Sequence, residues 1–208
     1  AMRALVFAML LMTTTLAGCV TPEPMLGEPT EPTTPSDATP ERMTIVAPTA
    51  GRSVDEGDIL DVVASANGNA TLLIWVAAGC SGCHDWTEMV ATAREEGNYT
   101  DLRVVSVHRY PSFEDADEVI DRYGTVNTST EATWPLLLPN DGDTVVNADT
   151  GEATAVDLVD AFQGPVTPTL QVLDGEGHLV WTSKTYWSND SVLEDAAALM
   201  RSLNEASA

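Results

Sequence analysis

The sequence predicts an α/β domain with a central mixed β-sheet and helices on both faces. Residues 71–77 form a continuous apolar run, Thr-Leu-Leu-Ile-Trp-Val-Ala, as expected for a strand that is buried on both faces of a sheet. Short apolar runs and amphipathic stretches then alternate along the chain. Near its end, the Asp-Gly-Glu-Gly at 174–177 separates two strand-like segments, which is typical of a β-hairpin. Alternating strands and helices followed by a hairpin and a helix indicate a mixed sheet.

The first half of the domain contains the clearer helix signals. Residues 81–96 predict a helix, because Trp86, Met89, Val90 and Ala93 recur at helical spacing and Gly-Asn follows. Residues 102–107 predict a second buried strand. Residues 113–123 predict a second helix, whose acid-rich start suits the positive end of the helix dipole.

The second half predicts shorter elements. We expect a short strand at 136–138, bounded by Pro135 and by a Pro-Asn-Asp-Gly turn, and a helical stretch around 155–162. The hairpin strands are expected at 170–173 and 178–183, and a closing amphipathic helix at 191–203.

The first 42 residues predict export and a tether. A short apolar stretch after Met2-Arg3 ends in Leu-Ala-Gly-Cys at 16–19, which resembles the lipobox of bacterial lipoproteins, in which the cysteine, here Cys19, receives the lipid. An ordinary signal peptide with an incidental cysteine is the alternative. The following segment is rich in Pro, Thr and Glu and lacks the apolar residues that a core needs. We therefore expect a signal at 1–18, a disordered tether at 19–42 and one domain at 43–208.

The charge of the chain excludes some partners. The 208 residues carry 32 acids and 9 bases, a formal net charge of -23, and Lys184 is the single lysine. Such a chain has no basic patch for nucleic acid, and anionic lipid would repel it, so attachment to a membrane must be covalent or apolar. The acid excess fits either the solvated surface of an exported protein or adaptation to high salt.

Two of the three cysteines form the motif Cys80-Ser81-Gly82-Cys83, at the point where the predicted strand gives way to the predicted helix. The free amide groups and dipole of a helix N-terminus stabilise a thiolate, which is the reactive form of cysteine. We therefore expect Cys80 to be the exposed nucleophile and Cys83 the resolving thiol that attacks a mixed disulfide.

The order of these features resembles the thioredoxin fold, and within it the TlpA/ResA group of membrane-tethered thiol-disulfide oxidoreductases. Three segments support the resemblance: residues 75–83 around the cysteines, the Trp-Pro-Leu-Leu-Leu at 134–138, and the stretch 166–177 that begins Val-Thr-Pro-Thr. The resemblance implies that Pro168 is a cis proline lying against the cysteine pair, and that the backbone of Thr167 pairs with a substrate chain. Ser81-Gly82 departs from the proline or histidine common between the cysteines, so the reduction potential cannot be inferred from the family.

Other residues near the motif have two interpretations. Ser81, Gly82 and Trp75 are candidates for contact with a substrate, although Trp75, like Trp86, also fits a core position. The sequence Cys80-Ser81-Gly82-Cys83-His84 additionally matches the covalent attachment motif of c-type haem, with His84 as axial ligand. Against haem stand the β-type run before the motif and the lack of an obvious second axial ligand. An inert structural disulfide is a further alternative, and the histidines offer no paired spacing for a metal such as zinc.

The sequence therefore predicts an extracytoplasmic, lipid-anchored thiol-disulfide oxidoreductase that needs no cofactor beyond its redox-active disulfide. Its expected partners are cysteine-containing exported proteins, whose disulfides it would reduce, and a thiol-disulfide protein that donates electrons. A haem-carrying electron-transfer protein and a thioredoxin-like binding module without turnover are the alternatives.

Overall fold

The strand β4 (Thr71–Val76) is the centre of a five-stranded mixed sheet in the computed structural model, which describes residues 35–207. The strand order is β10-β9-β4-β5-β6. The pairs β4–β5 and β5–β6 are parallel, whereas β9 is antiparallel to both β4 and β10. The other strands are β5 (Arg103–His108), β6 (Leu136–Leu137), β9 (Thr169–Leu173) and β10 (Leu179–Ser183), close to the predicted positions.

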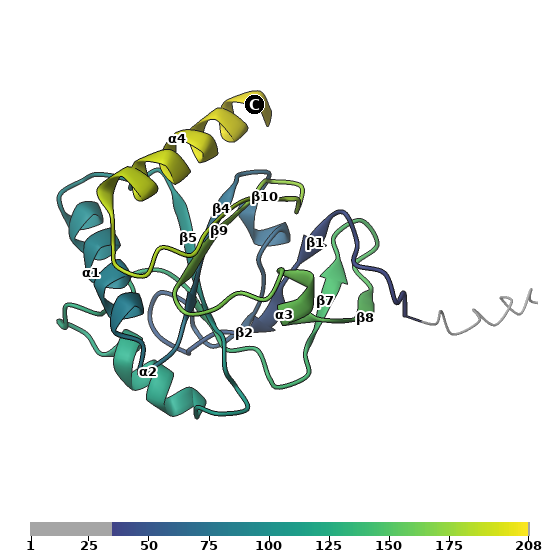
Figure 1. The fold of residues 1–208 in the computed structure, drawn as a ribbon, viewed down its shortest axis with the longest axis horizontal. Helices are drawn as coiled ribbons and strands as arrows, with labels where there is room; N and C mark the ends of the chain where they lie inside the picture. Colours follow the sequence, from purple (N-terminus) through teal and green to yellow (C-terminus); the bar gives the residue numbers. More distant parts are fainter. Residues whose placement is uncertain (1–34, 208) are drawn as a thin grey trace, which may run out of the picture. The chain divides into compact units, whose positions relative to one another are not determined.

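Every residue of β4 is buried, and alternate side chains enter two different cores. Leu72, Ile74 and Val76 join the core beneath three helices, α1 (Ser81–Glu95), α2 (Ala116–Gly124) and α4 (Asp190–Ser207). Leu73 and Trp75 point to the opposite core. Figure 1 shows the three helices on one side of the sheet.

The opposite face is covered by short elements. The helix α3 (Leu158–Ala161) packs there with a small sheet of order β1-β7-β8. Its strands are β1 (Met43–Thr44), β7 (Thr144–Asn147) and β8 (Ala153–Asp157); a separate pair is formed by β2 (Val46–Pro48) and β3 (Ile59–Asp61), and a 3₁₀ turn spans Ala64–Ala66. Helices on both faces are thus confirmed, but a four-residue helix and small sheets make up the second layer.

Two predicted helices differ from those observed. The stretch around 155–162 begins as β8, and its helix starts only after Asp157, whose carboxylate accepts hydrogen bonds from Val159 N (2.8 Å) and Asp160 N (3.3 Å). This N-cap ends the strand and begins α3. Similarly, α2 begins at Ala116 rather than 113, because the amides of Phe113 and Glu114 both bond to the carbonyl of Tyr110 in a separate turn.

The chain contacts the domain before its predicted start at 43. Ser36 O accepts a hydrogen bond from Ala155 N (2.9 Å), and Arg42 Nη1 lies 2.6 Å from Asp149 Oδ1. The predicted signal, the lipidation residue Cys19 and most of the predicted tether lie outside the described residues. Within residues 35–207, none of the helices combines the length and apolar character that a membrane span requires.

A largely buried ion pair fixes the end of α2. Arg52 lies 2.5 Å from Asp55 and donates to the carbonyls of Tyr123 (3.2 Å), Ala132 (2.7 Å) and Trp134 (2.8 Å). The last turn of a helix leaves carbonyls without an intrahelical partner, and the guanidinium pairs with one of them at Tyr123. The same guanidinium joins α2 to residues 132–134, which lead into β6.

Candidate active site

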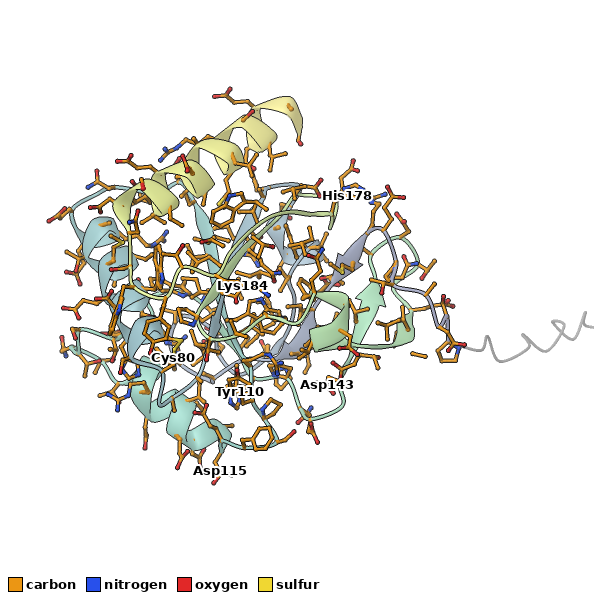
Figure 2. All side chains as sticks on the ribbon, in the orientation of Figure 1. Cys80, Tyr110, Asp115, Asp143, His178 and Lys184 are labelled. Atoms are coloured by element: carbon orange, nitrogen blue, oxygen red, sulfur yellow. A yellow bond between two sulfur atoms is a disulfide. The ribbon has the colours of Figure 1, made fainter. Side chains whose placement is uncertain are left out.

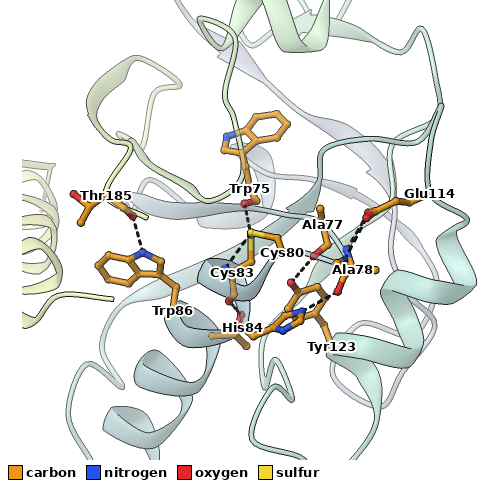
Figure 3. Close-up of a disulfide and its surroundings, with 12 residues drawn as sticks. Trp75, Ala77, Ala78, Cys80, Cys83, His84, Trp86, Glu114, Tyr123 and Thr185 are labelled. Atoms are coloured by element: carbon orange, nitrogen blue, oxygen red, sulfur yellow. Dashed lines mark hydrogen bonds between the residues drawn. A yellow bond between two sulfur atoms is a disulfide. The ribbon is translucent and has the colours of Figure 1, made fainter. Parts of the chain in front are cut away.

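Cys80 and Cys83 form a disulfide at the first turn of α1, with their Cα atoms 5.2 Å apart (Figure 3). Cys80 is the N-cap of the helix, and its Sγ accepts a hydrogen bond from Cys83 N at 3.2 Å. The residue Cys80 is 8% exposed and Cys83 is 0% exposed. Both cysteines are thus buried in the disulfide form, and Cys80 is the less buried of the two. The role of Cys80 as the attacking nucleophile stays a prediction.

The loop that carries Pro168 lies against this disulfide. The Thr167–Pro168 peptide bond is cis, as the resemblance implies. A Cβ atom placed on Gly82 would lie 3.1 Å from Pro168 Cδ, so the proline ring faces the residues between the two cysteines. Arg109 Nε donates to Pro165 O at 2.5 Å and holds this loop to the end of β5. Thr167 is half-buried, and its pairing with a substrate chain stays a prediction.

A second loop, residues 184–189, approaches the same point. A Cβ atom on Gly82 would overlap the carbonyl oxygen of Tyr186 and lie 3.1 Å from its ring. Hydrogen bonds fix this loop to α1 on both sides of Tyr186, from Trp86 Nε1 to Thr185 O (2.9 Å) and from Ser188 N to Asp85 (2.7 Å). The two loops therefore leave no room for a side chain at position 82, and only glycine fits there.

Two exposed aromatic side chains stand beside the disulfide on this loop. Tyr186 is 45% exposed and Trp187 is 59% exposed, and their rings meet edge to face at 4.9 Å between centroids. Val166, on the loop that carries the cis proline, is also exposed. Figure 2 shows Cys80 near α1 and α2, whereas His178, in the β9–β10 hairpin, lies far across the domain. The apolar surface formed by Val166, Tyr186 and Trp187 was not predicted from the sequence.

Side chains from α1, α2 and the loop before α2 hold the turn that leads from β4 to Cys80 (Figure 3). Tyr123 donates its hydroxyl to Ala77 O at 2.8 Å, and His84 Nε2 lies 2.8 Å from Ala78 O. The carboxylate of Glu114 accepts from Ala78 N at 2.9 Å and from Gly79 N at 3.3 Å. No sequence motif predicted these contacts, because the partners lie 6 to 46 positions apart in sequence.

Burial governs the protonation of two groups near this turn. It raises the pKa of Tyr123 above its ordinary value, so the hydroxyl stays a donor at all relevant pH values. Burial also lowers the pKa of His108, and the nearby Glu114 carboxylate only partly opposes this. His108 Nε2 lies 3.4 Å from Glu114 Oε2 without forming a hydrogen bond of acceptable geometry. The imidazole is accordingly neutral at neutral pH.

The structure corrects the expectation for Trp75. Its side chain is fully buried, donates from Nε1 to Gln171 Oε1 at 2.7 Å and packs against Phe162. Trp75 is therefore a core residue and does not offer its ring to a substrate. Ser81, in contrast, is exposed at the start of α1.

The contacts of the two cysteines and of His84 bear on the haem alternative. Attachment of haem would need both sulfur atoms free to form thioether bonds and His84 free to bind iron. Here the two sulfurs are bonded to each other, Cys83 is sealed from solvent, and His84 Nε2 contacts Ala78 O.

Comparison with known proteins supports the fold. No family model matches the sequence, and a search of curated proteins found no match. Solved structures do match. The thioredoxin domain of a thiol-disulfide oxidoreductase from Bacteroides vulgatus is 14% identical, with 81% of this chain and 99% of that chain covered and a TM-score of 0.52. The fold is thioredoxin-like.

Two further structures are similar over most of their length. A thiol:disulfide interchange protein of the thioredoxin family from Chlorobium tepidum is 15% identical, with 78% of this chain and 97% of that chain covered and a TM-score of 0.52. A hypothetical protein from Sinorhizobium meliloti is 18% identical, with 84% and 89% covered and a TM-score of 0.53. Within this fold, β4 and α1 carry the cysteines and β9 follows Pro168, so these elements bring the cysteines and the proline together.

Substitution of Gly82 by alanine should disturb this site. The added methyl group would meet the Tyr186 carbonyl and the Pro168 ring, so the helix start or a loop must move. We expect Gly82→Ala to lower the free energy of unfolding of the oxidised protein by about 1–3 kcal/mol, measured by urea denaturation. Ser81→Ala, at the exposed neighbouring position, is the matched control and should change it by less than about 0.5 kcal/mol. Equal stability of both variants would contradict the close approach.

Stability should also depend on pH through His108. Because its pKa is lower in the folded protein than the ordinary value of about 6.5, the unfolded chain binds more protons as the pH falls below about 6.5. The free energy of unfolding should therefore decrease as the pH drops through this range. The decrease should be shallower in His108→Gln, measured by urea denaturation at intervals between about pH 7.5 and pH 5. Parallel curves for the two proteins would disprove this assignment.

Proposed function

We propose that this protein is a thiol-disulfide oxidoreductase that reduces disulfides in other exported proteins. The observation that supports this function most directly is the Cys80–Cys83 disulfide at a helix N-terminus, with Pro168 of a cis peptide bond beside it in a thioredoxin-like fold. Cys80 is the less buried of the two cysteines, so a two-step exchange would begin there.

The reduced form would carry out that exchange without another cofactor. The Cys80 thiolate attacks one sulfur of a client disulfide, forming a mixed disulfide and releasing the first client thiolate. The Cys83 thiolate then attacks Cys80 Sγ, forming the Cys80–Cys83 disulfide and releasing the second client thiolate. Two electrons pass to the client, whose thiolates take up protons as their pKa values dictate. A dithiol donor protein must reverse these steps to restore the reduced pair.

The client would lie along the surface between the cis-proline loop and the 184–189 loop. A backbone segment beside Thr167 could reach Cys80, and exposed Val166, Tyr186 and Trp187 offer apolar contacts to residues that flank the client cysteine. Large exposed aromatic side chains on a loop whose backbone is held by hydrogen bonds bind partners with less loss of conformational entropy than those on a free loop. This surface also distinguishes the oxidoreductase from an inert disulfide.

We expect each cysteine substitution to stop the reaction at a different step. In a disulfide-reduction assay with insulin as client and dithiothreitol as donor, Cys80→Ser should lose the activity above background, because the attacking sulfur is missing. Cys83→Ser, reduced first and then freed of dithiothreitol before the client is added, should instead accumulate a covalent mixed disulfide between Cys80 and the client, visible on a non-reducing gel.

The same assay separates the alternatives. Cys19→Ser is the matched control, because it removes a cysteine outside the redox pair and should retain full activity. A wild-type protein that shows no activity would indicate the binding module without turnover, and a Soret band would indicate haem. A reduction potential near about -270 mV, as in thioredoxin, would fit a reductant, whereas about -120 mV would fit an oxidant.

We further propose that the domain is extracytoplasmic and anchored to a membrane through lipid on Cys19. The support is the Leu-Ala-Gly-Cys sequence at 16–19 and the scarcity of large apolar residues in the segment after it. When the full chain is expressed in a bacterium, Cys19→Ser should move the protein from the membrane fraction to the soluble fraction. An unchanged distribution between the two fractions would refute lipid anchoring at this residue.

A further inference from the structure

Glu114 occupies a position that the thiol-exchange steps do not use. It lies in the loop between β5 and α2, and its side chain is 20% exposed. Its two carboxylate oxygens accept hydrogen bonds from the amides of Ala78 and Gly79, the last two residues before Cys80. Hydrogen bonds from backbone amides to a charged group are stronger than those to a neutral one, so this residue constrains the turn.

The groups around Glu114 leave its negative charge largely uncompensated. His108, from β5, is neutral at neutral pH because burial lowers its pKa, and the Tyr123 hydroxyl, from α2, is neutral as well. From α1, His84 faces the carbonyl of Ala78.

On the solvent side, the turn borders an open hollow with acidic walls. The hollow has a volume of about 400 Å³ and is lined by Ala78, Gly79, Glu118, Asp121 and Arg122. Arg122 is its one cation against two acids among these lining residues. The turn before Cys80 therefore experiences a net negative field from α2 and from the loop that precedes it.

We propose that Glu114 is a positioning residue for the redox pair: it fixes the turn that presents Cys80, and its negative charge disfavours the thiolate form of Cys80. This inference rests on the proposed function and extends it by assigning the group that opposes the helix dipole at the reactive sulfur.

The sign of the effect follows from electrostatics. A nearby negative charge disfavours formation of a second negative charge, whereas the N-terminus of α1 favours it. The reduced state contains the thiolate and the disulfide does not, so destabilising the thiolate favours the disulfide. A couple that favours its disulfide gives up electrons more readily. Glu114 therefore biases the pair toward reduction of a client.

The test compares Glu114→Gln with wild type in the full chain. We expect the pH midpoint for alkylation of Cys80 by iodoacetamide, followed by mass spectrometry of the reduced protein, to fall by about one pH unit. At about pH 9, the equilibrium constant for reduction of the pair by glutathione should rise by up to about tenfold, which corresponds to about 30 mV for a two-electron couple. Amide hydrogen exchange at Ala78 and Gly79 should also become faster, because one glutamine oxygen cannot replace both carboxylate oxygens.

Glu118→Gln is the matched control. It removes one negative charge from the hollow that borders the same turn, but it removes no hydrogen bond to the turn, because Glu114 and not Glu118 accepts from Ala78 and Gly79. We expect only a small change in the alkylation midpoint and unchanged exchange at Ala78 and Gly79. An unchanged midpoint in Glu114→Gln, or equal shifts in both variants, would overturn the assignment.

Failure of the Glu114 proposal can be distinguished from failure of the proposed function. If wild type does not cycle between dithiol and disulfide, the oxidoreductase proposal fails. The alkylation midpoint, measured after chemical reduction, and the amide exchange rates still decide the role of Glu114.

Discussion

The turn from β4 to α1 has to satisfy its backbone polar groups within a few residues, and the rest of the site depends on how it does so. β4 is buried along its whole length, so its carboxyl end emerges among side chains rather than into water. An unpaired buried amide or carbonyl would cost about 1–3 kcal/mol. Tyr123, His84 and Glu114 supply the partners. Because two of them come from α2 and the loop before it, the geometry at Cys80 depends on the packing of α2, which Arg52 secures at its far end.

The dipeptide between the cysteines is explained by sterics at the same place. Gly82 is where the cis-proline loop and the 184–189 loop meet the start of α1, and the Tyr186 carbonyl occupies the space of a side chain. A larger residue there would require the exposed aromatic loop to be rebuilt. The glycine between the cysteines and the position of Tyr186 thus depend on each other. Together they set the shape of the surface beside the disulfide.

The sequence predicted the elements whose signals are local. The β4 run, the α1 periodicity and the hairpin of β9 and β10 depend on neighbouring residues, and the structure places them within a few residues of expectation. The starts of α2 and α3 were misplaced because the Tyr110 turn and the Asp157 cap compete with helical periodicity. Trp75 had two interpretations because a strand that is apolar on both faces does not reveal which side chains face the site, and the structure places it in the core. Glu114 and Tyr123 could not be found, since tertiary packing alone brings them to the turn.

The burial of Cys83 also determines what happens when the dithiol meets peroxide. Oxidants reach Cys80, the less buried of the two, first and convert it to a sulfenic acid, which can proceed irreversibly to sulfinic and sulfonic acids. A thiol three residues away, held within the same helical turn and shielded from solvent, condenses with that sulfenic acid and expels water. The product is the ordinary disulfide, which a donor can reduce again. The sealed sulfur proposed to resolve mixed disulfides would thereby also protect the pair from permanent oxidative inactivation.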